Sequence, residues 1–227
     1  MLNPTYSEIN GVQAISIFKR KKTENVGVDG NPLIYALKGI NGWRFKNTKE
    51  DIIGLLKQFI RISKKIKPGY DTIITCPSSN ELNTQFLHRL NKIIKSKSQI
   101  TGYLHKLTAT EVYEDFVNWE QIDIDYKEKS NKIKETLTKF LNKMHKENDG
   151  YFSYKFIKDV NLRKYITKTI YSDNETSIEY APYINDKNIL ILDDTIASGN
   201  TISGVCEEIF EMFTPKSATV ITLFSKL

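Results

Sequence analysis

The chain has 227 residues, of which 40% are hydrophobic, which suits one folded domain or one domain with a modest subdomain. Its 33 basic and 27 acidic side chains give a net charge of +6, and they are spread along the chain, so they favour anionic ligands only weakly. Two cysteines exclude a disulfide framework and a cysteine-based metal cluster. No signal-peptide pattern or membrane-length apolar run occurs, so we expect a cytoplasmic protein.

The N-terminal part alternates between apolar segments and polar stretches. Residues 12–20 and 33–38 are predicted to be short strands around a polar, glycine-containing stretch. Thr48 can cap a helix, which Lys67-Pro68-Gly69 would end. The apolar stripe of this helix recurs with the helical period and comprises Ile52, Ile53, Leu56, Phe59 and Ile60.

The middle of the chain contains a short strand, two helices and a segment without a clear pattern. We predict a buried strand over 72–76 and a helix over 84–95, whereas 100–126 mixes aromatic, β-branched and acidic residues. An amphipathic helix is predicted over 127–146, and 151–170 is predicted to be extended. The lysines of this helix are most simply its solvent-exposed face, with a nucleic-acid or partner surface as the alternative.

The last forty residues give the clearest pattern. They predict a strand over 189–192, a loop over 193–200, a helix over 201–213 and a strand over 218–224. Strand, helix and strand in this order indicate an α/β protein with a mostly parallel central sheet flanked by helices. Ligands bind such sheets beyond the carboxyl ends of the strands, which is where the polar loops are expected.

The loop after the strand at 189–192 combines two carboxylates with small and hydroxylated residues. Asp193 and Asp194 come first, and Gly199 precedes the expected start of a helix at Thr201. Backbone N–H groups at a helix N-terminus bind anions, whereas the two acids suit neutral hydroxyls or a divalent cation. A ribose 5-phosphate has an anion and vicinal hydroxyls at this spacing. The alternative is a strand–loop–helix connection in which the acids are solvated turn or capping residues.

The segment ILILDDTIASGNT resembles the phosphoribosyl-pyrophosphate (PRPP) binding motif of type I phosphoribosyltransferases. The resemblance implies that Asp193 and Asp194 are catalytic, hold the ribose hydroxyls and bind Mg²⁺ directly or through water. The residues that it implies for ribose and 5-phosphate binding are Asp193, Asp194, Thr195, Ala197, Ser198, Gly199, Asn200 and Thr201. Enzymes of the family that act on 6-oxopurines commonly have aspartate where this chain has Ala197, which argues against hypoxanthine or guanine as acceptor.

A second loop corresponds to the pyrophosphate loop of this family. Pro77, Ser78, Ser79 and Asn80 follow the strand at 72–76 and are implied to bind pyrophosphate, although Pro-Ser-Ser-Asn is also an ordinary turn composition. The chain is also loosely similar to ComF-type proteins, but the arginine-rich stretch and the N-terminal cysteine cluster of that type are absent.

The resemblance implies a division of the chain and a reaction. Residues 1–70 would contribute to a hood, and 71–227 would form the core with a helical insertion near 127–147. The expected function is transfer of the 5-phosphoribosyl group from PRPP to a nucleobase or amine nitrogen, with Mg²⁺ as cofactor and a homodimer as the family's usual assembly. The alternative is a regulatory, competence-associated or defence-associated protein that binds PRPP or a nucleotide without transfer.

Two roles in the expected reaction are less well defined by the sequence. Lys106, Arg163 and Lys164 are candidates for a lid that reaches the pyrophosphate, with ordinary surface basic residues as the alternative. No general base for the acceptor can be assigned, because the three histidines are scattered without a carboxylate or serine at catalytic spacing.

Overall fold

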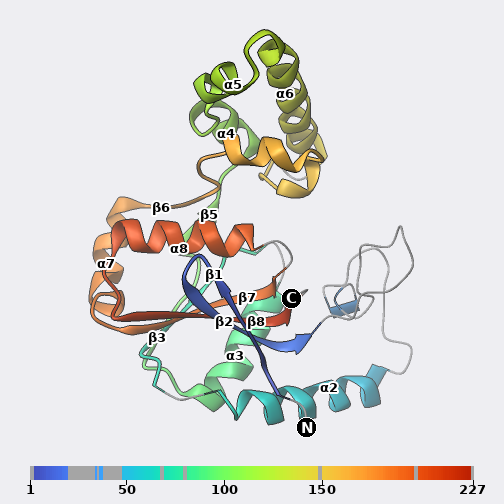
Figure 1. The fold of residues 1–227 in the computed structure, drawn as a ribbon. Helices are drawn as coiled ribbons and strands as arrows, with labels where there is room; N and C mark the ends of the chain where they lie inside the picture. The colour runs from blue at the N-terminus through green and yellow to red at the C-terminus, as the bar shows by residue number, and fades with distance from the viewer. Residues whose placement is uncertain are drawn as a thin grey trace.

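A computed structural model describes residues 3–19, 34, 36–37, 48–66, 69–78, 81–147, 150–196 and 199–225. In this part of the chain the central sheet has six strands in the order β1-β2-β8-β7-β3-β4 (Figure 1). Only β1 runs antiparallel to its neighbour, and the remaining pairs are parallel. The strands are β1 (Thr5–Ile9), β2 (Val12–Lys19), β3 (Thr72–Thr75), β4 (Ser98–Ile100), β7 (Asn188–Ile196) and β8 (Ser217–Ser225).

Helices cover both faces of this sheet. On one face, α2 (Thr48–Ser63) and α3 (Leu82–Ile94) pack on side chains that include Leu190 of β7. On the other face, α7 (Asn174–Ile184) and α8 (Asn200–Met212) pack on side chains that include Ile191. Successive residues of a strand point to opposite faces, so the apolar run of β7 supplies both cores. The predicted α/β class with a mostly parallel sheet flanked by helices is confirmed.

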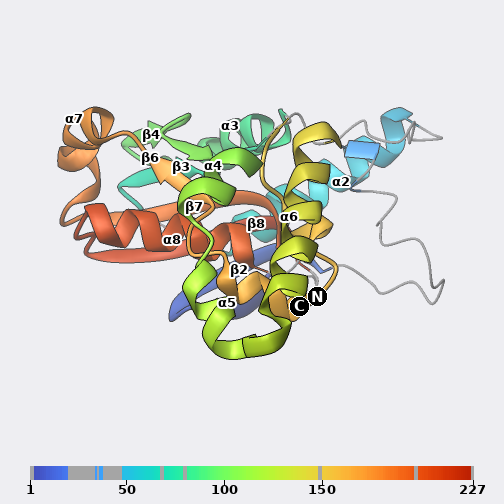
Figure 2. The ribbon, with the colours of Figure 1, turned by 90° about the horizontal axis from the view of Figure 1, so that it is seen from above.

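A helical insertion lies between two short antiparallel strands, β5 (Leu104–Lys106) and β6 (Ile170–Ser172). It stands over the α8 side of the sheet (Figures 1 and 2). Residues from Leu107 to Ile166 form its separate apolar core. Its elements are α4 (Ala109–Asp115), α5 (Trp119–Tyr126), η1 (Lys127–Lys129), α6 (Ser130–Glu147), η2 (Tyr154–Phe156) and η3 (Val160–Tyr165).

Two segments that were predicted to be extended are helical in part. Within the segment 33–38, the described residues Ile34, Ala36 and Leu37 are helical instead of extended, which agrees with the high helix propensity of alanine and leucine. The segment 151–170 contains the 3₁₀ helices η2 and η3. The Asp159 carboxylate caps η3 by accepting a hydrogen bond from the Asn161 N–H at 3.0 Å, a local contact that competes with extended structure.

The predicted boundaries also differ from the observed arrangement. Strands β1 and β2 belong to the central sheet, where β2 pairs with β8, so residue 70 is not a boundary of the sheet. The insertion is larger than 127–147, because α4, α5 and η3 share its apolar core. In α2 the buried face differs from the predicted stripe: Phe59 and Ile62 are buried, whereas Ile60, which was predicted to be part of the stripe, is exposed.

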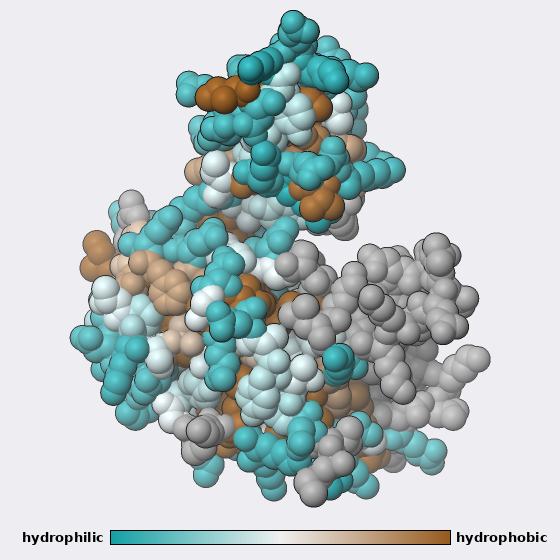
Figure 3. Space-filling view, viewed as in Figure 1, coloured by the Kyte–Doolittle hydropathy of each residue, from teal (hydrophilic) through white to brown (hydrophobic). Residues whose placement is uncertain are grey.

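Among the described residues, no helix combines the length and apolar character needed to cross a membrane. The surface of the insertion is largely hydrophilic (Figure 3). The lysines of α6 contribute to it, and Lys132, Lys139 and Lys146 are all exposed. This agrees with the interpretation of these lysines as the solvent-exposed face of an amphipathic helix, whose opposite side buries Leu137, Leu141 and Met144.

Candidate functional site

The two adjacent carboxylates lie at the carboxyl end of β7, a central strand of the sheet. The sequence predicted that a loop begins at Asp193, but β7 continues to Ile196 because pairing with β8 extends to Ser225. Asp193 and Asp194 therefore lie within the strand and are only 8% and 5% exposed. Burial of an ionised carboxylate is unfavourable without polar partners, so the environment of this pair is informative.

Asn83, in the first turn of α3, connects this pair to the end of β3. Its Nδ2 donates to the Cys76 carbonyl oxygen at 3.2 Å and to Asp193 Oδ1 at 3.4 Å. Asp193 Oδ1 also accepts from the Asp194 N–H at 2.9 Å. One amide thus holds together the carboxyl ends of two neighbouring parallel strands. Sequence reasoning missed Asn83, because its partners are separated from it by 7 and 110 residues.

At the carboxyl end of the sheet, two buried polar atoms have no hydrogen-bond partner among the described residues: Asn83 Oδ1 and Thr195 Oγ1. Asn83 is 3% exposed as a whole residue. Buried polar groups are nearly always paired in folded proteins, so each exception calls for an explanation such as a bound ligand, ion or water. Thr195 belongs to the segment that resembles the PRPP motif, whereas Asn83 does not.

A cavity of about 680 Å³ opens beside β3 and α3. Its walls include Cys76, Pro77 and Ser78 from the end of β3, Asn83 from α3, and His105 and Lys106 from β5. The insertion contributes the remaining wall, where Tyr151 and Phe152 lie. Of the predicted pyrophosphate residues, Pro77 and Ser78 line this cavity, whereas Ser79 and Asn80 lie outside the described residues.

The turn that enters α8 has a backbone conformation that favours glycine. Gly199 is the N-terminal flanking residue of α8 and has φ 81°, in the left-handed region. A Cβ atom at this position would lie 3.6 Å from Ile9 Cγ2, an ordinary contact, so the requirement for glycine is conformational. Asn200 and Thr201 form the first turn of α8. Ala197 and Ser198 lie outside the described residues.

The two cysteines do not form a reactive thiolate site. Burial, followed by the charge of Asp193, raises the pKa of the Cys76 thiol well above its ordinary value. Burial raises the pKa of Cys206 to about 12. Both thiols are therefore neutral at physiological pH, and they pack as small apolar groups in the core.

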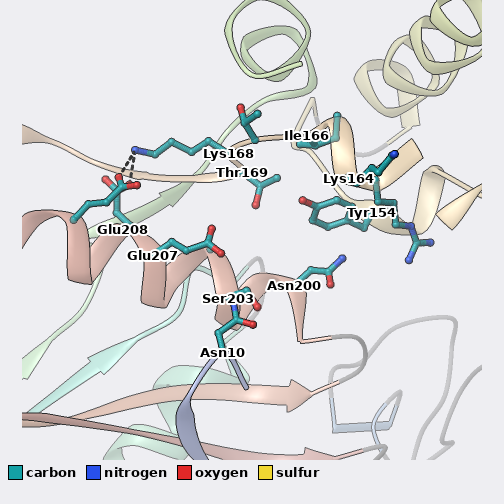
Figure 4. Close-up of a pocket in the computed structure, with 14 residues that line it drawn as sticks. Asn10, Tyr154, Lys164, Ile166, Lys168, Thr169, Asn200, Ser203, Glu207 and Glu208 are labelled. Atoms are coloured by element: carbon teal, nitrogen blue, oxygen red, sulfur yellow. Dashed lines mark ion pairs between the residues drawn. The ribbon is translucent and has the colours of Figure 1, made fainter. Parts of the chain in front are cut away.

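The three lid candidates lie at two different places. Lys106 lines the cavity beside Pro77 and Ser78. Arg163 and Lys164 instead line a second cavity of about 400 Å³ between α8 and the insertion (Figure 4). There, Arg163 donates to the Ile157 carbonyl oxygen from Nε at 3.1 Å and Nη2 at 2.9 Å, while Lys164 Nζ pairs with Asp125 at 2.6 Å.

The second cavity is bounded by acidic residues of α8 (Figure 4). Lys168 forms ion pairs with Glu208 at 2.5 Å and with Glu211 at 3.7 Å. Glu207 faces the same space, and burial followed by the charge of Glu211 raises its pKa. Basic and acidic side chains therefore both face the second cavity, which Asn200 and Ser203 at the start of α8 also line.

Mg²⁺ prefers oxygen ligands, and the buried carboxylates at the end of β7 are of this kind. The described residues contain no group of three or more His, Cys, Asp or Glu side chains that could hold a metal ion. Magnesium keeps several waters and takes further ligands from the substrate, so it does not require an all-protein cage. The buried carboxylates of Asp193 and Asp194 provide acceptors for a hydrated ion. The residues present therefore fit Mg²⁺.

The chain matches no family model, no curated protein and no solved structure.

Proposed function

We propose that this protein binds PRPP with Mg²⁺ and transfers its 5-phosphoribosyl group to a nitrogen acceptor, with release of pyrophosphate. The observation that carries the proposal is the buried pair Asp193–Asp194 at the carboxyl end of β7, directly before the glycine turn that enters α8. Carboxylates suit ribose hydroxyls, and a helix N-terminus suits the 5-phosphate. Along the chain, the carboxylates are followed by the helix N-terminus, just as the ring hydroxyls of the ligand are followed by its 5-phosphate.

In the proposed reaction, the bond between ribose C1 and the pyrophosphate oxygen breaks, and pyrophosphate leaves with the electron pair. The acceptor nitrogen forms the new bond to C1 and loses a proton. The carboxylates of Asp193 and Asp194 hold the ribose hydroxyls and stabilise the positive charge that develops on the sugar. When bound, Mg²⁺ supplies charge neutralisation for the leaving group.

The cavity beside β3 suits the leaving group. Pro77 and Ser78 line it from the end of β3, and Lys106 lines it from β5. A lysine at this position provides a positive charge for the pyrophosphate. Unlike the planar guanidinium of arginine, its ammonium group can pair with the anion from several directions. Tyr151 and Phe152 of the insertion bound the same space, so the insertion contributes to the choice of substrate.

The test is release of pyrophosphate from PRPP with Mg²⁺, measured against a panel of nucleobases and amines. We expect turnover with at least one acceptor, and a loss of about 100-fold or more in Asp194→Asn, because the charge that stabilises the transition state is removed. Asp186→Asn is the matched control: this exposed turn residue lies at the opposite end of β7, and its φ of 58° is a conformation that asparagine tolerates.

The outcomes separate three accounts of the site. An Asp194→Asn variant with the activity of the wild type would remove the acids from the mechanism. Binding of PRPP without pyrophosphate release for any acceptor would favour the binding protein without transfer. Binding of neither PRPP nor its fragments would contradict the proposal as a whole.

A further inference from the structure

We infer that Asn83 binds one of the two ring hydroxyls of the sugar ligand through Oδ1, beside Asp193, and so determines selectivity for ribose over the deoxy sugar that lacks this hydroxyl. This inference rests on the proposed function, since it assigns an additional contact within the same site. It concerns a residue outside both segments that resemble the family motifs.

The orientation of the Asn83 amide follows from its neighbours. Both groups within hydrogen-bond distance of Nδ2 are acceptors: the Cys76 carbonyl oxygen at 3.2 Å and Asp193 Oδ1 at 3.4 Å. If the amide were rotated by 180°, its oxygen would face two acceptors and both hydrogen bonds would be lost. The NH₂ group is therefore committed to the protein, and Oδ1 is directed away from these two partners.

The Oδ1 atom is a buried acceptor without a donor. It has no hydrogen-bond partner among the described residues, although Asn83 is only 3% exposed. An unsatisfied buried polar atom is unfavourable, and a ligand that supplies a donor relieves it. Asn83 also lines the cavity of about 680 Å³, so this donor can arrive from a bound ligand.

The chemistry of the neighbouring groups restricts the ligand to a donor-rich one. An ionised Asp193 carboxylate only accepts hydrogen bonds, and Asn83 Oδ1 also only accepts. A phosphate placed against these two groups would be repelled, whereas a sugar hydroxyl can donate to either of them. Vicinal hydroxyls of ribose can donate to both. We therefore assign to Asn83 one of the two ring hydroxyls, with Asp193 as the acceptor for the other.

The test uses ligands that differ by one hydroxyl. Dissociation constants are measured calorimetrically for ribose 5-phosphate, 2-deoxyribose 5-phosphate and 3-deoxyribose 5-phosphate with the wild type and Asn83→Ala. In the wild type, loss of the paired hydroxyl is expected to weaken binding about 10-fold or more. In Asn83→Ala, ribose 5-phosphate and the corresponding deoxy sugar should bind equally, because the partner of that hydroxyl is gone.

The matched control is Asn91→Ala at the other end of α3. Asn91 Oδ1 accepts hydrogen bonds from the Ser96 N–H at 2.9 Å and from its hydroxyl at 2.7 Å, so this variant also loses asparagine contacts of α3. It should keep the full discrimination between the three sugars. Thermal unfolding of both variants measures the structural effect separately from binding.

The remaining outcomes overturn the inference in distinguishable ways. If Asn83→Ala weakens all three sugars by the same factor, or none of them, Asn83 is structural and the inference fails while the proposed function stands. If the wild type binds none of the three sugar phosphates, the inference fails, and the proposed function fails with it only if PRPP is not bound either.

Discussion

The central sheet and the helical insertion are both built on apolar cores, but they differ in the polar groups that they bury. At the carboxyl end of the sheet, Asp193 and Asp194 of β7 are buried together with Asn83 of α3. Among the described residues between 107 and 166, every buried residue is hydrophobic. Other polar residues such as Ser16, Ser63 and Glu208 are also buried outside the insertion, but among the described residues two buried carboxylates follow each other only at Asp193–Asp194.

The charged groups of the insertion lie on its surface and hold its own helices together. Asp125 accepts hydrogen bonds from Lys164 and Tyr165 at 2.6 Å each and from Gln121 at 2.7 Å. These contacts join α5 to η3. The insertion therefore contributes a cavity wall from a separately packed scaffold, whereas the buried carboxylates lie at the carboxyl end of the sheet.

The largest effect on stability is expected for Leu190→Ala in the sheet. Leu190 is 0% exposed in the centre of β7, and truncation leaves a cavity between the strand and the helices that cover it. We expect a loss of about 2–5 kcal/mol in the free energy of unfolding, measured with chemical denaturant. Hydrogen exchange should accelerate in β7 and in the elements that share its core with Leu190, which include β3, β8 and α3, and a change confined to β7 would contradict this packing.

A more local effect is expected for Leu137→Ala in the insertion. Leu137 is also 0% exposed, so the same atoms are removed from an equally buried site, but this site belongs to the separate apolar core. Hydrogen exchange should accelerate in α4, α5 and α6 while the amides of β7 and β8 remain protected. Loss of protection in both regions would show that the two cores unfold as one unit.

The smallest effect is expected from the surface network of Asp125. Its hydrogen bonds from Lys164, Tyr165 and Gln121 lower the pKa of Asp125 below its ordinary value. The stability that they contribute is present above the unfolded-state pKa of about 3.9 and is lost as the pH falls through the lower folded-state value. Asp125→Asn should therefore weaken the insertion at neutral pH and reduce its response to acid below about pH 4.

Circular dichroism during an acid titration measures this response. The control is Asp115→Asn, an exposed acid of α4 in the same insertion. It should keep the acid response of the wild type. An Asp125→Asn variant with an unchanged acid profile would contradict the assigned role of this network.

Local patterns predicted the parts of the fold that depend on local sequence. The apolar run of β7, the helical stripe of α3 and the strand of β8 were predicted within a few residues, because each has a clear hydrophobic period. The extent of the insertion was not predicted, since α4 and α5 are short and their core depends on contacts with α6.

The candidate site was predictable only in part for the same reason. Asp193 and Asp194 stand out as adjacent acids after an apolar run, and a strand–loop–helix pattern places them at a sheet edge. The role of Asn83 depends on the pairing of β3 with β7, which brings together residues 110 positions apart. No local pattern encodes such a contact, and an asparagine in the first turn of a helix is common.

The most direct test of the central claim is a thermal-shift titration with PRPP, with and without Mg²⁺, on the wild type and on Asp193→Asn/Asp194→Asn. A ligand at about a hundred times its dissociation constant adds about 2.7 kcal/mol to stability, which for a chain of this size raises the Tm by about 5–10 °C. We predict a Mg²⁺-dependent shift of this size in the wild type and none in the variant. A wild type whose Tm is unchanged by PRPP, or a variant whose Tm rises by the same amount, would contradict the assignment of the carboxyl end of β7 as a PRPP site.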